Sequence, residues 1–181
     1  MIDEFLPEHD FIETHHISIH AYAADIYRAA NEVDFSESPI IRWLIRLRGM
    51  SVGKLTLRNL GGSKFEMLGE TINKEMVIGI VGRFWTIAGN LQKIDAESFK
   101  AFDKAGFAKA VWNFSLVTDG DNTRLTTETR IKCLDADSRR SFGRYWMFIR
   151  PFSGLIRTEM LKTIKRKAEL SEPGAVATGL F

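Results

Sequence analysis

The sequence contains a single cysteine, and this scarcity excludes an internal disulfide. Cys133 follows the same strand alternation as Ile131, which predicts that its side chain lies on an apolar face. No histidine or aspartate around it forms a recognisable nucleophile pattern. We therefore expect Cys133 to be a buried and unreactive thiol.

Long apolar runs are also absent. The longest run, residues 76–85, is too short to cross a bilayer and contains Arg83. The N-terminal segment MIDEFLPEHD is acidic and lacks the apolar core of a signal peptide. These features predict a soluble, cytoplasmic protein without stable membrane insertion.

The net charge is small, at +2, so the composition indicates neither nucleic acid nor an acidic partner. An apolar fraction of 45% and a charged fraction of 27% are typical of a soluble globular protein. The 181 residues suffice for a single domain with a sizeable core, and no linker divides them. Thirteen Phe and four Trp residues indicate either a well-filled core or a cavity lined with aromatic rings.

Alternation of apolar and polar residues predicts strands, and apolar spacing of three to four residues predicts helices. The predicted strands are residues 11–20, 64–72, 75–85, 90–94, 107–118 and 123–134. The predicted helices are residues 23–33, 39–48 and 135–170, with Ser38 as the N-cap of the second and Gly49 just past its end. A short helical or irregular connection is predicted at residues 96–106. Residues 51–63 are flanked by glycines and read as a short helix or a loop, with a lid over a pocket as the alternative. Residues 171–181 are expected to form a loosely ordered tail.

The segment DGDN, residues 119–122, is a strong hairpin signal between two strand-like segments. A two-residue or a four-residue loop gives the same register, in which Leu116 faces Leu125 and Trp112 faces Thr129. Because a slip of one residue would turn every side chain to the other face, this register is a definite prediction.

The two faces of this hairpin differ in the apolar surface that they offer for burial. The face with Trp112, Phe114 and Leu116 is predicted to point inward, because its apolar burial outweighs anything on the other face. Thr127 and Thr129 share that inner face, and their buried hydroxyls require a backbone, water or ligand partner. The residues predicted to face solvent are Asn113, Glu128 and Arg130.

A proline, Pro151, interrupts the predicted C-terminal helix. Proline removes an amide donor and clashes with a carbonyl of the preceding turn, which costs about 3 kcal/mol in a straight helix. We therefore predict a kink or break within about one turn of Pro151, which would hold the helix off the sheet. The same helix has an apolar stripe more typical of core than of ligand contacts, formed by Phe142, Trp146, Ile149, Ile156 and Met160.

The order of these elements resembles the START-like superfamily, also called SRPBCC. The segments that carry the resemblance are THHISIHAYAADIYRAA, VIGIVGRFW, AKAVWNFSLV and GDNTRLTTETRI, and two of them are similar to an uncharacterised bacterial subgroup. The resemblance covers roughly residues 11–169 of a single domain, 1–181. It implies an α+β helix-grip fold, in which a curved antiparallel sheet wraps around a long C-terminal helix and two short helices follow the first strand.

The superfamily includes lipid transfer, hormone binding, polyketide cyclisation and ring oxidation, so the fold alone does not select a function. Ring oxidation requires an iron site, and the histidines of the first strand, His15, His16 and His20, show no facial arrangement with a carboxylate. We therefore expect no metal and no cofactor. The sequence does not indicate an oligomeric state.

Three functions remain open. The first is binding, and possible transport, of an apolar small molecule such as a lipid, an isoprenoid quinone or a polyketide-like compound. The second is a cyclase or dehydratase type of enzyme that uses the same pocket, with Arg83, Tyr145 or a pocket carboxylate polarising a carbonyl. The third is a structural or interaction module with a filled core.

The pocket is predicted to lie between the C-terminal helix and the inner face of the sheet. The face occupied by Arg83 cannot be assigned from the sequence, because both alternating sets of its strand are apolar. The predicted ligand-binding residues are Trp43, Ile80, Arg83, Trp112, Phe114, Thr127, Thr129, Tyr145, Trp146 and Ile149.

Overall fold

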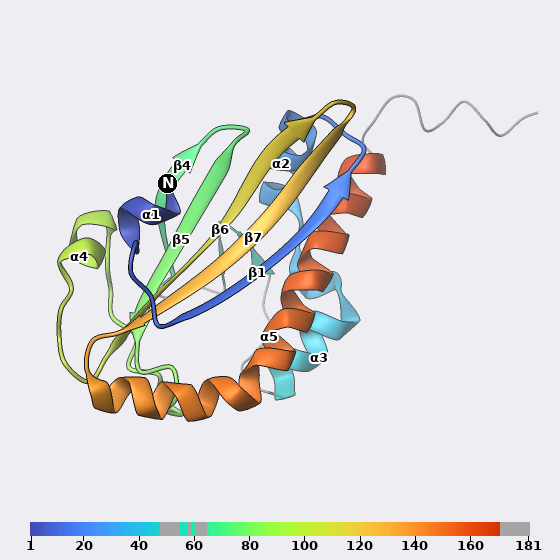
Figure 1. Ribbon diagram of the computed structural model, residues 1–181. Coiled ribbons are helices and arrows are strands. Elements are labelled where there is room, and N and C mark those ends of the chain that lie inside the picture. Colours follow the sequence, from blue (N-terminus) through green and yellow to red (C-terminus); the bar gives the residue numbers. More distant parts are fainter. Residues whose placement is uncertain (48–54, 58, 61–64, 171–181) are drawn as a thin grey trace, which may run out of the picture.

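The computed structural model describes residues 1–47, 55–57, 59–60 and 65–170 (Figure 1). The helices are α1 Ile2–Phe5, α2 Ala23–Glu32, α3 Pro39–Leu47, α4 Ala96–Ala101 and α5 Ala136–Leu170, with a 3₁₀ turn at Phe35–Glu37. The strands are β1 Phe11–Ile19, β2 Leu55–Thr56, β3 Asn59–Leu60, β4 Glu66–Thr71, β5 Glu75–Gly82, β6 Ala108–Asp119 and β7 Asn122–Cys133.

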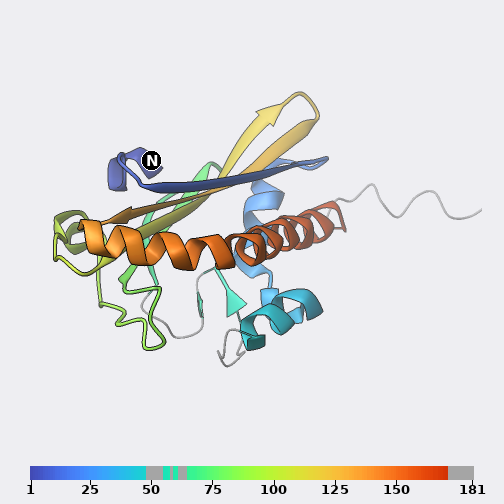
Figure 2. The ribbon, with the colours of Figure 1, turned by 60° about the horizontal axis from the view of Figure 1, so that its bottom comes forward.

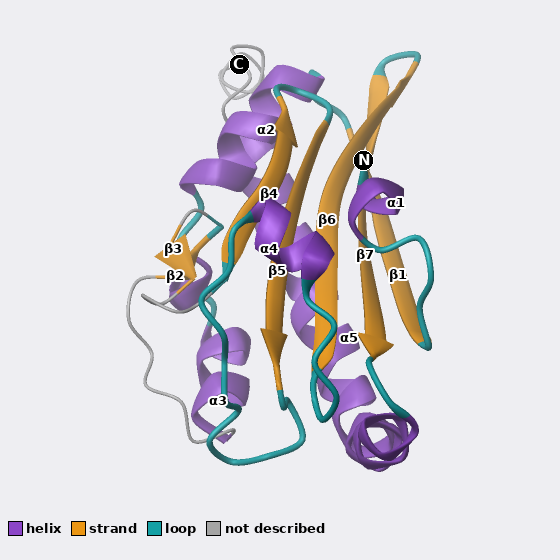
Figure 3. Cartoon of the chain, turned by 90° about the vertical axis from the view of Figure 1, so that its left-hand side faces the viewer, coloured by secondary structure: helices purple, strands orange, loops and turns teal. Residues whose placement is uncertain are grey.

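Five strands form one antiparallel sheet in the order β1-β7-β6-β5-β4. The helices α2, α3 and α5 lie on one side of this sheet, and α1 lies on the other (Figure 2). Seen from the left-hand side of Figure 1, α1 and α4 stand in front of the strands and α5 lies behind them (Figure 3). The predicted α+β helix-grip fold is therefore confirmed, with the addition of two short helices on the outer face.

Two apolar clusters follow from this layering. The inner cluster lies between the sheet and α2, α3 and α5, and it includes Ile78, Trp112 and Phe114. The outer cluster lies between the sheet and α1 and α4, and it includes Val77 and Phe99. Because β5 is buried on both faces, its sequence is apolar at both alternating sets of positions.

The predicted register of the β6–β7 hairpin is confirmed. Leu116 pairs with Leu125 and Trp112 pairs with Thr129, around a two-residue turn in which Gly120 has a φ of 58°. Trp112, Phe114, Thr127 and Thr129 are all buried on the inner face.

The prediction that Asn113, Glu128 and Arg130 face solvent is wrong for Asn113, which is only 5% exposed, and for Arg130, whose side chain is only 11% exposed. These residues do lie on the outer face, but the N-terminal segment with α1 covers that part of the sheet. The Asn113 amide donates to Glu75 at 2.7 Å and accepts from the backbone amide of Glu128 at 2.9 Å. Glu128 and Arg130 are half-buried in the same place.

The long helix α5 changes direction near its middle, between its orange and its red part (Figure 1). Pro151 lies inside the helix, which continues through it without a break. Of the two predicted alternatives, a kink or a break, the kink is therefore confirmed. Asp135 caps the start of α5, because its carboxylate accepts from the amide of Ser138 at 2.8 Å and from its hydroxyl at 2.6 Å. These hydrogen bonds, with a further one from the Gly106 amide, lower the pKa of Asp135 to about 2.

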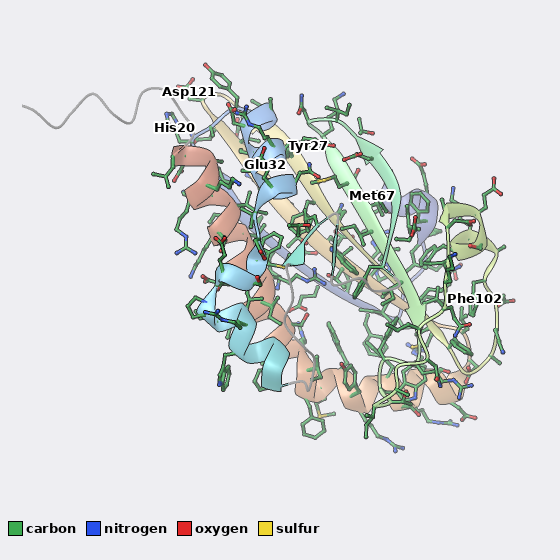
Figure 4. The ribbon with its side chains drawn as sticks, turned by 180° about the vertical axis from the view of Figure 1, so that it is seen from behind. His20, Tyr27, Glu32, Met67, Phe102 and Asp121 are labelled. Atoms are coloured by element: carbon green, nitrogen blue, oxygen red, sulfur yellow. The ribbon has the colours of Figure 1, made fainter. Side chains whose placement is uncertain are left out.

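Side chains tie the inner helices to the sheet and to each other (Figure 4). The hydroxyl of Tyr27 on α2 donates to Glu70 on β4, at the far edge of the sheet. Glu32 at the end of α2 forms an ion pair with Lys167 on α5 at 3.2 Å. These contacts hold α2 between the edge strand and the second half of α5.

Two local predictions differ from the structure. Residues 90–94 were expected to form a strand, but only the amide of Gln92 joins the sheet, donating to the carbonyl of Val81 at 2.9 Å. The segment around residues 54–60 was expected to be a helix or a loop, and its described part pairs as the short strands β2 and β3. Most of the proposed lid, residues 51–63, lies outside the described residues.

Candidate functional site

The inner face of the edge strand β1 carries a hydrogen-bonded pair of ionisable side chains. Nε2 of His15 donates to Oε1 of Glu13 at 3.1 Å, and only 9% of the Glu13 side chain is exposed. Across the neighbouring strand, Glu13 pairs with Thr129 and His15 pairs with Thr127. Because cross-strand partners point to the same face, these four side chains form a polar patch in an otherwise apolar interior.

Gly154 of α5 lies directly over this pair. A Cβ atom at Gly154 would lie 2.9 Å from Oε1 of Glu13 and 3.5 Å from Nε2 of His15. The first distance is shorter than a van der Waals contact, so glycine allows the helix backbone to approach the carboxylate closely. The kinked part of α5 therefore closes over the polar patch rather than over an apolar surface.

Arg157, one helical turn after Gly154, reaches the same region. Its guanidinium carbon lies 5.1 Å from the centre of the Trp112 ring, which pairs with Thr129 in the sheet. Removal from water lowers the pKa of Arg157 to about 10, although the attraction of Glu13 opposes this shift. None of the described residues forms a hydrogen bond or ion pair with the guanidinium group, so the indole ring is its main contact.

Several buried polar atoms in this region have no hydrogen-bond partner among the described residues. They are Oε2 of Glu13, Nε1 of Trp112 and Oγ1 of Thr127. Buried polar groups are normally paired, and leaving one unpaired costs about 1–3 kcal/mol. Nε1 of Trp112, the hydroxyl of Thr127 and the guanidinium of Arg157 can donate, and Oε2 of Glu13 can accept.

A cavity of about 250 Å³ opens between β1 and α5 beside this cluster. Its wall includes His15, so the hydrogen-bonded pair lies at the boundary between the cavity and the interior. The volume is below the range of about 300–1,000 Å³ that is typical of small-molecule pockets. The residues that line it are Thr14, His15, His16, Ile17, Thr158, Leu161 and Lys162.

The ten residues predicted to bind a ligand are distributed over four environments, and none of them lines this cavity. Five of them are buried on the inner face of the sheet, namely Ile80, Trp112, Phe114, Thr127 and Thr129. Tyr145, Trp146 and Ile149 are half-buried on the first half of α5. Trp43 projects outward from α3, with 59% of its surface exposed, and so lies outside the interior.

Arg83 follows the end of β5 and is directed to the outer face. Its guanidinium carbon lies 4.8 Å from the centre of the Phe107 ring, which belongs to the outer cluster. A Cβ atom at Gly106 would lie 2.8 Å from one of its terminal nitrogens. Arg83 is therefore held by Phe107 and Gly106, rather than beside the inner polar patch.

Glu13, His15 and Arg157 were not predicted as site residues, although the sequence contains a signal for each. Glu13 and His15 share strand parity with the buried Ile19, which places them on the inner face. Arg157 precedes Met160, Leu161 and Ile164 by three, four and seven residues, and all three are buried. An arginine on the buried stripe of a helix is unusual, so this spacing could have identified Arg157 as a candidate site residue.

The other potential chemistry of the chain is limited. Cys133 is buried, and burial raises the pKa of its thiol to about 12, which agrees with the expected unreactive cysteine. In the described part of the chain, no cluster of three or more His, Cys, Asp or Glu side chains is arranged to hold a metal ion. The described helices include none with the length and apolar character needed to cross a membrane.

Comparison with known proteins gives similarity to solved structures only. No protein-family model matches the chain, and a search of curated proteins gave no significant match. Protein MLL2253 from Mesorhizobium loti is 15% identical, with a TM-score of 0.42 over 88% of this chain and 99% of that chain. TTHA0849 from Thermus thermophilus is 9% identical, with a TM-score of 0.35 over 90% and 99% of the two chains. Ara h 8.0201 is 8% identical, with a TM-score of 0.31 over 88% and 98%.

Proposed function

We propose that this protein binds a small molecule with an apolar body and an anionic or carbonyl head group, in the interior between the sheet and α5. Lipids, isoprenoid quinones and polyketide-like compounds have this general chemistry. The observation that supports the proposal is a pair of buried donors without partners among the described residues, Nε1 of Trp112 and Oγ1 of Thr127, together with Arg157. A bound carbonyl or carboxylate would accept hydrogen bonds from these donors, while the aromatic residues of the inner cluster would contact the apolar body.

Arg157 is the residue that we expect to select the head group. A guanidinium group matches a carboxylate with two parallel hydrogen bonds, whereas a neutral hydroxyl offers only one acceptor oxygen. Its present position over the Trp112 ring leaves its donors available to a ligand. Because the cavity of about 250 Å³ is small, a long ligand would require α5 or its neighbours to move apart.

Tryptophan fluorescence tests this proposal directly, because Trp112 lies in the proposed site. We expect decanoate to change the emission saturably and to bind at least about tenfold more tightly than decanol, which corresponds to about 1.4 kcal/mol. Arg157→Met is expected to abolish this preference for the acid. Trp112→Phe is expected to remove most of the signal, whereas Trp43→Phe is the matched control at an exposed position. No saturable change with either probe, or an undiminished preference in Arg157→Met, would contradict the proposal.

The hydrogen bond between His15 and Glu13 favours a second candidate, an enzyme that removes a proton next to a carbonyl. A carboxylate that orients an imidazole is a common arrangement for general base catalysis, and His15 lies on the cavity wall. In this function Arg157 would stabilise the developing enolate oxygen. Nuclear magnetic resonance of acetylacetone in D₂O tests it: exchange of the methylene protons should be accelerated by the protein and lost in His15→Asn. Exchange at the buffer rate with the wild-type chain would exclude the enzyme and leave the binding protein.

A further inference from the structure

The outer side of the bend in α5 carries large apolar side chains that no described residue covers. Met147 and Phe148 are 72% and 73% exposed, and Phe152 and Leu155 are also exposed. Spacings of four and seven residues place Phe148, Phe152 and Leu155 on one side of the helix. Single exposed apolar residues are common, but a stripe of this kind marks an interaction surface.

The helix α3 extends this surface. It lies beside the middle of α5, where the helix bends (Figure 1). Ile40 and Trp43 project outward from it, and both are exposed. We define the docking surface as Ile40, Trp43, Met147, Phe148, Phe152 and Leu155.

The charges around this surface have one sign. Arg42, Arg144 and Arg150 are exposed on the same two helices. In the sequence, residues 38–43 and 138–158 contain no aspartate or glutamate. The exposed apolar side chains on the described parts of α3 and α5 are therefore flanked by cations rather than by carboxylates.

We propose that this surface docks the protein onto an anionic lipid bilayer. Phe, Trp and Leu side chains suit the boundary between head groups and acyl chains, and arginines suit anionic head groups. A second copy of the chain is a poorer occupant, because a two-fold contact of this surface would bring like charges together. The docked helices lie on the bilayer rather than across it, and docking does not require the ligand proposed above.

Cosedimentation of the full chain with vesicles tests this proposal. The probe vesicles contain about two parts phosphatidylcholine to one part phosphatidylglycerol, with pure phosphatidylcholine as the reference. We expect the protein to pellet with the anionic vesicles and to be released at about 1 M salt, where the Debye length is about 3 Å. Phe148→Ser with Phe152→Ser should weaken the binding at least about tenfold. Arg144→Glu with Arg150→Glu should remove the preference for the anionic vesicles. Each arginine replaced should weaken binding to these vesicles by about fivefold or more.

The matched control is Ile72→Ser with Val117→Ser, which removes two exposed apolar side chains from other parts of the molecule. This control should pellet like the wild type, and circular dichroism should show the same unfolding temperature for all variants. Equal pelleting of the Phe148 and Phe152 variant and the wild type would overturn the proposal. A concentration-dependent dimer in analytical ultracentrifugation, lost in that variant, would also overturn it and identify a second copy as the occupant.

Discussion

Two arginines on opposite faces of the same sheet are held in opposite ways. On the outer face, Arg130 donates to Glu128 and Asp3 at 2.6 Å each and to the carbonyl of Leu6 at 3.1 Å. On the inner face, Arg157 lies over the Trp112 ring without a hydrogen-bond partner in the described part of the chain.

The difference distinguishes a structural polar cluster from a site that is available to a ligand. The Arg130 contacts join the N-terminal segment to the sheet, and both Nε and Nη1 of Arg130 have acceptors there. The inner site leaves atoms of Glu13, Trp112 and Thr127 unpaired among the described residues. Both the Arg130 contacts and the inner site are only partly accessible to solvent. Burial alone would therefore not show which of the two is structural and which is available to a ligand.

Replacement of Arg130 should have the largest effect on stability. Arg130→Met leaves Glu128 and the carbonyl of Leu6 without their partner, so we expect a loss of about 2 kcal/mol in the free energy of unfolding. Binding of decanoate should be unchanged in the folded variant. Urea denaturation measures the loss; an unchanged midpoint would show that the Arg130 contacts contribute no net stability.

Replacement of Arg157 should change ligand preference and leave stability nearly unchanged, the opposite of what is expected for Arg130. Arg157→Met removes a desolvated cation that has no ion-pair partner among the described residues, so the free energy of unfolding should stay within about 0.5 kcal/mol of the wild type or increase. The preference for decanoate over decanol should disappear. A loss of stability as large as that of Arg130→Met would show that Arg157 is structural, and the comparison between the two faces would fail.

The two glycines of α5 sharpen the comparison within the inner face. A Cβ atom at Gly143 would lie 3.6 Å from the nearest carbon of Phe11, an ordinary contact. Gly143→Ala should therefore stabilise the protein by about 0.5–1 kcal/mol, because alanine favours the helix. Gly154→Ala should give no such gain, because its Cβ would displace Oε1 of Glu13. Thermal unfolding of both variants measures the difference; equal stabilisation would show that Glu13 moves aside without cost.

Asp135, at the start of α5, provides the smallest of these effects, and it depends on pH. Hydrogen bonds from Ser138 and Gly106 lower the pKa of Asp135 to about 2, below its ordinary value of 3.8. A lowered carboxyl pKa contributes stability that is fully present above the ordinary value and is lost as the pH falls toward 2. Between pH 5 and pH 2, Asp135→Asn should therefore lose less stability than the wild type. Parallel unfolding midpoints of the two proteins across this range would contradict the assignment.

Much of the fold could be predicted from the sequence, because the relevant signals are local. Alternation located the strands, the turn DGDN set the register of β6 and β7, and Pro151 marked the kink in α5. Residues 90–94 were mispredicted, because a short alternating segment does not reveal whether a neighbouring strand is available to pair with it.

The candidate site depends on contacts that no local pattern contains. Trp112, Thr127 and Thr129 were correctly assigned to the inner face, but their neighbours Glu13 and Arg157 come from opposite ends of the chain. The sequence also predicted that Asn113 faces solvent, because nothing in its own strand indicates that the N-terminal segment folds over it. By itself, the sequence determined which side chains share a face, since that follows from the periodicity of each element. Only the tertiary structure decided what covers each face, because that depends on the packing of segments that are distant in the chain.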